Sequence, residues 1–162
     1  MSGGTIRLLI VDDHPVVRDG LRGMFSGEPG FEVVGEAANG DEAVTLAGTL
    51  RPDVVLMDLR MPGGDGVTAI GRLVRGGSDA RVLVLTTYDT DSDVLPAIEA
   101  GATGYLLKDA RSDELFRAVR SALHGFVTLE AAGGFGLPQD VEESYERLVD
   151  VLDAGLTSGS TR

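Results

Sequence analysis

Residues 8–15 read Leu-Leu-Ile-Val-Asp-Asp-His-Pro. Four consecutive apolar residues are typical of a strand in a parallel sheet, because helices cover such a strand on both faces. Pro15 suits the first position of a helix, where an N–H group has no partner within the helix. The segment therefore predicts a strand that passes directly into a helix, with two carboxylates, Asp12 and Asp13, at the junction. His14 is expected to begin the helix rather than to bind a metal.

The same alternation of a short apolar run and an amphipathic stretch of about ten residues occurs five times between residues 6 and 125. The predicted strands are Ile6–Val11, Phe31–Glu36, Val54–Met57, Val82–Leu85 and Gly104–Leu107. The second run contains two glutamates and is expected at a sheet edge, whereas the first, third and fourth are almost entirely apolar and are expected at its centre. Short right-handed connections then predict an α/β fold with a doubly wound, five-stranded parallel sheet in the flavodoxin-like order 2-1-3-4-5.

Apolar residues at helical spacing follow each predicted strand, and residues near their starts indicate where the helices begin. The second helix is expected to be capped within Asn39-Gly40-Asp41, and the fifth by Ser112 as its N-cap. The fourth falls within residues 91–100, but Pro96 lies inside this stretch. Either that helix begins late or its first turn is irregular.

Polar residues follow four of the five apolar runs. They are Asp12 and Asp13 after the first run, Asp58 after the third, Thr86 after the fourth and Lys108 after the fifth. The carboxyl ends of parallel strands meet at one edge of the sheet, which is also where such sheets bind ligands. The chain has one lysine and thirteen arginines, so a lysine at this position suggests a compact charge directed at a phosphate.

Three converging carboxylates repel one another unless a cation neutralises them. A site of oxygen ligands without cysteine suits Mg²⁺. With Mg²⁺ and Lys108 nearby, Asp58 becomes a reasonable nucleophile toward a phosphoryl donor. Any one of these residues alone is more often a helix cap or a solvated side chain, so the prediction of phosphoryl transfer to an aspartate rests on their combination.

The composition limits the class of protein. The 162 residues include 14 Lys and Arg against 26 Asp and Glu, a formal charge of −12, and no cysteine. We expect no binding of nucleic acid by this chain itself, because phosphate backbones are bound by Lys and Arg. The apolar runs are far shorter than the roughly 18 residues of a membrane span, and no signal peptide is recognisable. The expected location is the cytoplasm, with no membrane partner.

Four segments together resemble the receiver domains of two-component response regulators. The resemblance covers about residues 5–125 and looks most like the NarL/FixJ branch, whose members usually carry a LuxR-type helix-turn-helix domain after the receiver. The matching segments are Leu8-Leu9-Ile10-Val11-Asp12-Asp13-His14-Pro15, Pro52-Asp53-Val54-Val55-Leu56-Met57-Asp58-Leu59-Arg60-Met61-Pro62, Val82-Leu83-Val84-Leu85-Thr86-Thr87 and Ala100-Gly101-Ala102-Thr103-Gly104-Tyr105-Leu106-Leu107-Lys108-Asp109.

The resemblance implies a phosphorylation-dependent signalling switch rather than an enzyme, phosphorylated by a sensor histidine kinase. It implies that Asp58 is the phospho-acceptor and that Asp13 binds Mg²⁺ directly. Asp12 would act on the metal mainly through water, and the backbone carbonyl of Arg60 would complete the protein ligands. Asp109 follows Lys108 where many receivers have proline, which removes the usual reason for a cis peptide there.

Three further residues take roles from the same resemblance. Lys108 would bind a phosphoryl oxygen, and Thr86 would reorient to hydrogen-bond the phosphoryl group. Tyr105 matches the aromatic residue that turns inward as the threonine moves, so that about two new negative charges change the surface of the receiver. Simple packing at the edge strand is the alternative interpretation of Tyr105.

Residues 126–162 differ from the rest, with seven acidic residues against two arginines. A helix is predicted over residues 141–154, since Val141, Tyr145, Leu148, Val149 and Leu152 share one helical face. It could dock on its own receiver, or mediate a homodimer or another contact; the last residues are expected to be disordered. A DNA-binding domain needs about 60 residues and a basic surface, so we expect none here. The chain is then either a stand-alone receiver or a receiver from a transcriptional regulator.

Three rival functions remain on the residues alone. A Mg²⁺-dependent phosphohydrolase of the haloacid dehalogenase type would carry Asp-x-Asp after its first strand, where this chain has Asp12-Asp13-His14, and would need a substrate cap. A flavin or dinucleotide module would need a glycine-rich or Thr/Ser-rich phosphate loop after the first strand, and none is present. A receiver-like scaffold without phosphorylation is disfavoured by the complete set of acidic residues, Thr86 and Lys108.

Overall fold

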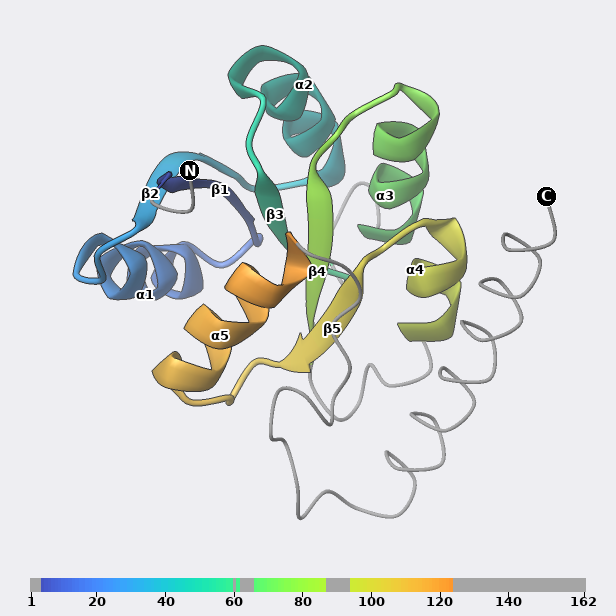
Figure 1. Cartoon of the computed structure of the whole chain (residues 1–162). Coiled ribbons are helices and arrows are strands. Elements are labelled where there is room, and N and C mark those ends of the chain that lie inside the picture. The colour runs from blue at the N-terminus through green and yellow to red at the C-terminus, as the bar shows by residue number, and fades with distance from the viewer. Residues whose placement is uncertain (1–3, 60, 62–65, 87–93, 124–162) are drawn as a thin grey trace, which may run out of the picture.

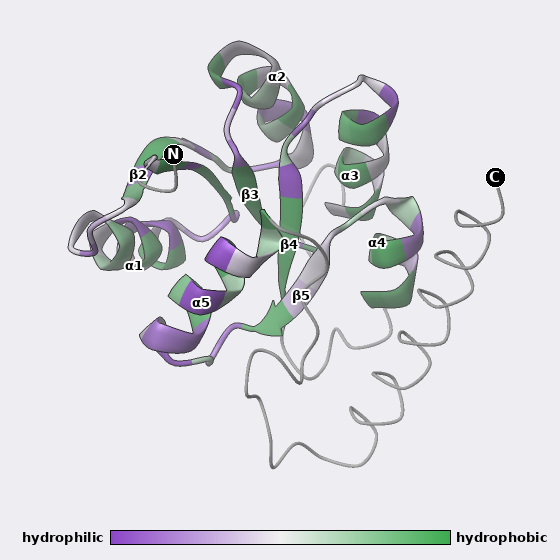
Figure 2. Cartoon of the chain, viewed as in Figure 1, coloured by the Kyte–Doolittle hydropathy of each residue, from purple (hydrophilic) through white to green (hydrophobic). Residues whose placement is uncertain are grey.

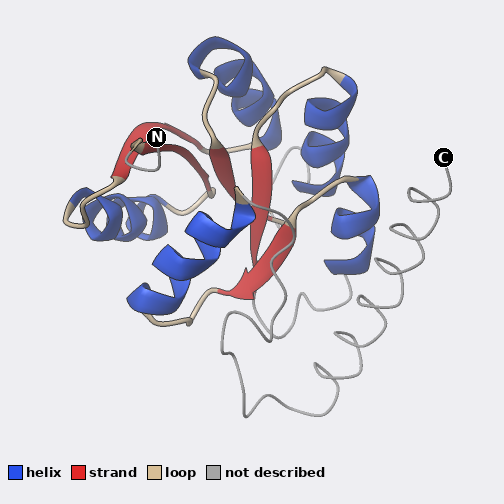
Figure 3. Cartoon of the chain, viewed as in Figure 1, coloured by secondary structure: helices blue, strands red, loops and turns tan. Residues whose placement is uncertain are grey.

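The computed structural model describes residues 4–59, 61, 66–86 and 94–123. Strands and helices alternate along the chain (Figures 1 and 3). The strands are β1 (Ile6–Val11), β2 (Phe31–Ala37), β3 (Val54–Asp58), β4 (Arg81–Thr86) and β5 (Gly104–Leu107). The helices are α1 (Pro15–Ser26), α2 (Gly40–Leu50), α3 (Gly66–Arg75), α4 (Val94–Ala100) and α5 (Ser112–Ala122).

The five strands form one parallel sheet in the order β2-β1-β3-β4-β5, which confirms the predicted fold class and topology. β1 and β3 pair in the middle, with Val11 opposite Met57. This register brings the residues that follow Val11 next to the end of β3. β2 lies at an edge, as its glutamates predicted, and its register with β1 shifts by one residue between Leu8 and Leu9.

Helices cover both faces of the sheet. α1 and α5 lie on one face, where Phe25 and Val119 pack on Leu8, Ile10 and other strand residues. α2, α3 and α4 lie on the opposite face, over the alternate residues of the same strands. Figure 2 shows β3 and most of β4 as apolar, whereas polar and apolar residues alternate along the helices. This two-sided burial explains why the central strands read as continuous apolar runs.

The starts of α1 and α2 agree with the sequence, and the start of α5 differs from it. Pro15 occupies the first turn of α1, and the Asn39 side chain accepts a hydrogen bond from the N–H of Glu42, 2.9 Å away, at the start of α2. The described part of α4 runs from Val94 to Ala100 and contains Pro96. The residues before Val94 lie outside the described ones, so the two alternatives for the start of this helix stay predictions.

The expectation of Ser112 as N-cap of α5 was wrong by one residue. Ser112 is the first helical residue, and Arg111 is the extended residue before it. The Glu114 carboxylate accepts a hydrogen bond from the backbone N–H of Arg111, 3.4 Å away. A glutamate three residues after the flanking position reaches back in this way in a capping box, so the position of Glu114 decides where the helix begins.

Some predictions fall outside the described residues. These are the role of Arg60 and all predictions for residues 126–162, including the helix over 141–154 and the domain division near residue 125. Among the helices that the structure describes, none is both long and apolar enough to cross a membrane.

Candidate functional site

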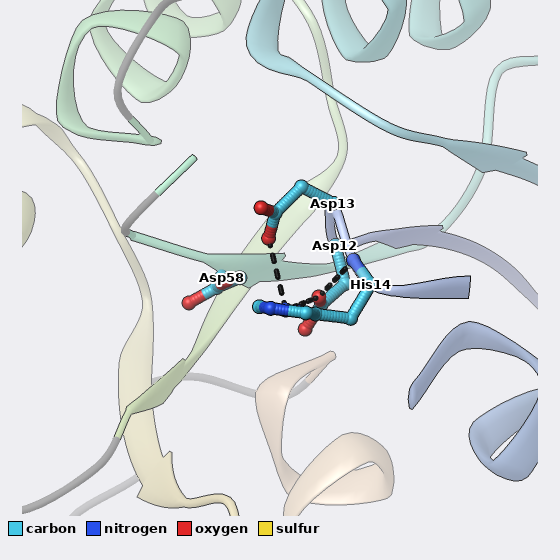
Figure 4. A group of neighbouring side chains, drawn as sticks. All are labelled: Asp12, Asp13, His14 and Asp58. Carbon is cyan, nitrogen blue, oxygen red and sulfur yellow. Dashed lines mark hydrogen bonds and ion pairs between the residues drawn. The ribbon is translucent and has the colours of Figure 1, made fainter. Parts of the chain in front are cut away.

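Four side chains converge at the carboxyl ends of β1 and β3. Asp58 is the last residue of β3, and Asp12, Asp13 and His14 form the connection from β1 to α1. One ligand atom from each of the four lies within 4.8 Å of the others. Figure 4 shows the four side chains grouped at this edge of the sheet. The predicted convergence of Asp12, Asp13 and Asp58 is therefore present, and His14 joins them.

Asp12 is buried and accepts hydrogen bonds at its carboxylate and at its backbone carbonyl. The residue is only 2% exposed, and one of its carboxylate oxygens accepts a hydrogen bond from the backbone N–H of His14 at 2.8 Å. The other oxygen accepts one from the Lys108 ammonium at 3.0 Å. The Arg18 guanidinium donates to the backbone carbonyl of Asp12. A buried carboxylate with these partners has a fixed orientation and a compensated charge.

Lys108 extends its side chain from the end of β5 to the carboxylates of Asp12 and Asp58. It follows β5, and its backbone N–H donates to the carbonyl of Thr86 at 2.7 Å. Its ammonium lies 3.0 Å from Asp12 and 3.4 Å from Oδ2 of Asp58. The described residues contain no cis peptide bond, so the bond between Lys108 and Asp109 is trans.

Partial burial of Lys108 acts to lower its pKa, but the hydrogen bond to Asp12 and the negative charges of Asp58 and Asp12 outweigh burial. The net result is a raised pKa. Lys108 is therefore charged at neutral pH. Its ion pairs contribute stability that is fully present below the ordinary lysine pKa and is lost as the pH rises through the raised value.

Asp13 offers an oxygen atom without a hydrogen bond. Its Oδ1 is buried and has no hydrogen-bond partner among the described residues. The His14 Nδ1 lies 3.1 Å from this oxygen and 3.2 Å from Oδ1 of Asp12. A buried carboxylate oxygen without a hydrogen bond is costly unless a cation binds there. The arrangement of hard oxygen atoms around this point fits a divalent cation such as Mg²⁺.

His14 begins the first helix as predicted, since it is the extended residue just before α1. The sequence did not indicate that its ring would also approach both neighbouring aspartates. The ring is largely exposed, at 66%. An exposed ring can rotate away from the carboxylates, so its position does not block a cation.

Thr86 and Tyr105 lie on the two strands nearest the far edge of the sheet. Thr86 is the last residue of β4, one residue past the partner of Asp58 in the sheet register. Both residues are almost fully buried, at 2% exposed. Tyr105 packs in the apolar cluster with Val94 and Ile98 of α4. The aromatic ring therefore lies inward in this structure, against the helix that follows Thr86 in the chain.

Gly66 is a residue of this site that the sequence did not reveal. It begins α3, and its N–H donates to the carbonyl of Leu59 at 3.0 Å. A Cβ atom at this position would lie 2.6 Å from the backbone oxygen of Asp58 and 2.9 Å from the Cα of Leu59. Only glycine lets α3 approach the end of β3 so closely. Its place shortly after an aspartate at a strand end was the available signal.

We expect Gly66→Ala to destabilise the protein by about 1–3 kcal/mol, the usual cost of overpacking, because backbone atoms would have to move. The end of β3 would shift with them, so binding of Mg²⁺ should weaken as well. Denaturant unfolding and calorimetric titration with Mg²⁺ measure the two effects. Gly23→Ala on α1 is the control, because a Cβ there meets nothing within 4 Å. Equal stability of the two variants would contradict the packing argument.

Comparison with known proteins identifies the family. A model of the response regulator receiver domain matches residues 8–120. The chain belongs to the response regulator receiver family. Receivers of this family generally act as signalling switches, bind Mg²⁺ at an acidic pocket and interact with sensor histidine kinases.

Similar proteins of known role are transcriptional response regulators. This receiver is 47% identical over 126 residues to the transcriptional regulatory protein LiaR of Bacillus subtilis, covering 78% of this chain and 60% of LiaR. It is 44% identical over 119 residues to the nitrate/nitrite response regulator NarP of Escherichia coli, covering 74% of this chain and 55% of NarP. The chain thus spans little more than half the length of these relatives.

The solved structures give the same family. The signal receiver domain of the response regulator NarL from Mycobacterium tuberculosis superposes with a TM-score of 0.71 and 36% identity. The match covers 75% of this chain and 98% of that domain. The predicted receiver fold and the NarL-type resemblance are therefore confirmed.

Proposed function

We propose that Asp58 accepts a phosphoryl group from a phosphohistidine of a sensor kinase. One observation carries this proposal: the chain's single lysine lies 3.4 Å from Asp58, at an edge where three carboxylates converge. A lone ammonium paired with a nucleophilic carboxylate can hold an incoming phosphoryl oxygen. Membership of the receiver family supports the same role.

Asp13 and Asp58 would bind Mg²⁺ directly, and the backbone carbonyl of Arg60 would supply another oxygen. Asp12 already accepts hydrogen bonds on both oxygens, which suits a role through metal-bound water. The Oδ1 of Asp13, which accepts no hydrogen bond from the described residues and lies 3.1 Å from the exposed His14 ring, supports the direct role of that residue. Bound Mg²⁺ would neutralise the negative charge that the carboxylates and the phosphoryl group bring together.

In the transfer step, a carboxylate oxygen of Asp58 attacks the phosphorus atom of the phosphohistidine. The new P–O bond forms while the P–N bond breaks, and the imidazole leaves with the electron pair of that bond. Lys108 holds one phosphoryl oxygen by its ammonium, and the Thr86 hydroxyl donates to another. The result is an aspartyl phosphate at the end of β3.

Thr86 and Tyr105 would convert this modification into a change of surface. Thr86 would move toward the phosphoryl group, and Tyr105 would respond within the packing of α4. Dimerisation of the phosphorylated receiver is one way to transmit that change. We propose that the output is the control of transcription through a DNA-binding domain outside residues 1–162. The alternative is a stand-alone receiver that acts through contact with another protein.

The proposal is tested by incubating the chain with acetyl phosphate and Mg²⁺, followed by intact mass measurement. We expect a gain of one phosphoryl group that depends on the metal and does not occur in EDTA. The aspartyl phosphate should be lost in neutral hydroxylamine, because this nucleophile attacks acyl phosphates and leaves phosphoserine and phosphothreonine intact. No gain at saturating Mg²⁺ would refute the proposal.

A further inference from the structure

A groove lies at the end of the sheet opposite Asp58. It has a volume of about 740 Å³ and is bounded by the loop that joins α2 to β3 and the loop that joins α3 to β4. Both loops lie at the upper end of the sheet in Figure 1, where they lead into β3 and β4. We call it the arginine groove, after the three arginines that line it: Arg51, Arg72 and Arg81.

The arginine groove combines positive charge with an apolar wall. Its three guanidinium groups stand against two carboxylates, those of Asp53 and Asp79. Asp53 accepts a hydrogen bond from the backbone N–H of Arg7 at 2.8 Å, which orients the carboxylate and leaves its charge in place. Arg72 also pairs with Asp41 at 2.5 Å, on the exposed side. The lining side chains thus carry a net charge of +1, and the Arg7 guanidinium, which donates to the carbonyl of Arg51 at 2.9 Å, adds a positive charge beside the one that Asp41 offsets. The groove is therefore slightly positive in a chain of charge −12, which suits an acidic partner.

The apolar part of the groove wall includes the last residue that the structure describes. It is formed by Val44 and Ala47 of α2, Leu73 of α3, and Leu123, which follows α5. Leu123 is the last described residue. The remaining 39 residues of the chain therefore start at the groove itself.

The sequence after Leu123 contains a segment of matching character. Residues 138–154, which we call the acidic segment, hold six acidic residues and one arginine. Its apolar residues, Val141, Tyr145, Leu148, Val149 and Leu152, share one face if the segment is helical. Such a helix would place its apolar face on the groove wall and its flanking carboxylates near the arginines.

We propose that the acidic segment docks in the arginine groove of its own chain. The 18 residues from Leu123 to Val141 span up to about 60 Å when extended, so the connection does not restrict the return. A short tether raises the effective concentration to the millimolar range, which makes even a weak contact populated. The groove lies at the opposite end of the strands from Asp58, so docking leaves the phosphorylation site open. The proposal is independent of the proposed function.

The test uses paramagnetic broadening in the full chain. The protein has no cysteine, so Ser144→Cys allows a single nitroxide label within the acidic segment. In ¹⁵N-labelled protein we expect loss of the amide signals of Gly48, Gly76 and Ser78 around the groove. The signals of Gly20 and Gly23 on α1 should persist, and reduction of the nitroxide should restore all signals. High salt should weaken the effect, because it screens the charges.

Charge reversal decides whether the arginines hold the segment. Arg51→Glu combined with Arg72→Glu should restore the groove signals. Arg111→Glu combined with Arg117→Glu, which makes the same charge change just before α5 and within it, should leave the broadening in place. Glu142→Lys with Glu146→Lys removes the attraction without touching the receiver, so it answers the question even if the groove variant does not fold.

Several outcomes would overturn the proposal. Intact groove signals in the labelled protein would show that the segment does not dock there. Broadening on another face would assign it a different site. Equal broadening of ¹⁵N-labelled chains without nitroxide, when they are mixed with separate nitroxide-labelled chains, would make the occupant a second copy. Broadening that survives both charge reversals would exclude the arginines as its cause.

Discussion

Asp58→Asn is expected to abolish phosphorylation by acetyl phosphate completely. Asparagine has nearly the same shape, but its amide is neutral and a poor nucleophile, so no P–O bond forms. The substitution also removes one of the three carboxylates within 4.8 Å of one another, so affinity for Mg²⁺ should fall. Intact mass measures the first effect, and calorimetric titration measures the second.

Asp79→Asn provides the matched control for Asp58→Asn. Asp79 lies in the loop before β4, at the opposite end of the strands from Asp58. The same chemical change there should leave both the phosphoryl gain and the Mg²⁺ affinity unchanged. Should Asp58→Asn still take up one phosphoryl group per chain, the acceptor is another residue, and peptide mapping of the phosphorylated protein would locate it.

Lys108→Met should change two properties in opposite directions. Phosphorylation should slow by about 10²–10³-fold, the usual loss when one preorganised electrostatic contact to a transition state is removed. Binding of Mg²⁺ should tighten by roughly tenfold, because the ammonium that neutralises Asp12 and Asp58 no longer competes with the cation. The distances of 3.0 and 3.4 Å make this competition direct.

Two further variants separate the effect of the Lys108 charge from the effect of the shape of its side chain. Lys108→Arg keeps the charge but replaces a compact ammonium by a planar group, so Mg²⁺ affinity should stay low while phosphorylation remains impaired. Arg117→Met removes a positive charge from an exposed position of α5 and should change neither property. A weaker affinity for Mg²⁺ in Lys108→Met would show that the lysine organises the carboxylates more than it competes for them.

The fold was predictable because its signals are local and repeated. The apolar run before Asp12 and the run before Asp58 each mark a buried strand, and short connections leave few topologies. The start of α5 was misplaced by one residue because Ser112 and Glu114 both offer caps. Which of two adjacent caps is used depends on backbone geometry that residue type does not specify.

The sequence predicted which residues lie at the site better than it predicted the contacts between them. Asp12, Asp13, Asp58, Thr86 and Lys108 were expected at one edge because every parallel strand ends there. The roles of His14 and Gly66 were not apparent. A histidine beside two aspartates and a glycine shortly after a strand-end aspartate have ordinary uses elsewhere, so these positions were signals too weak to reveal the two roles.

The succession of apolar runs and the polar residues at their ends were thus sufficient to define the receiver fold and the acidic edge. The tertiary structure decided which groups touch. Lys108 reaches Asp12 across 96 positions of sequence, and Gly66 meets the backbone of Asp58 because α3 packs against β3. Such contacts depend on how separate elements pack in space. A local pattern of residues does not specify the distances between elements that are far apart in the sequence.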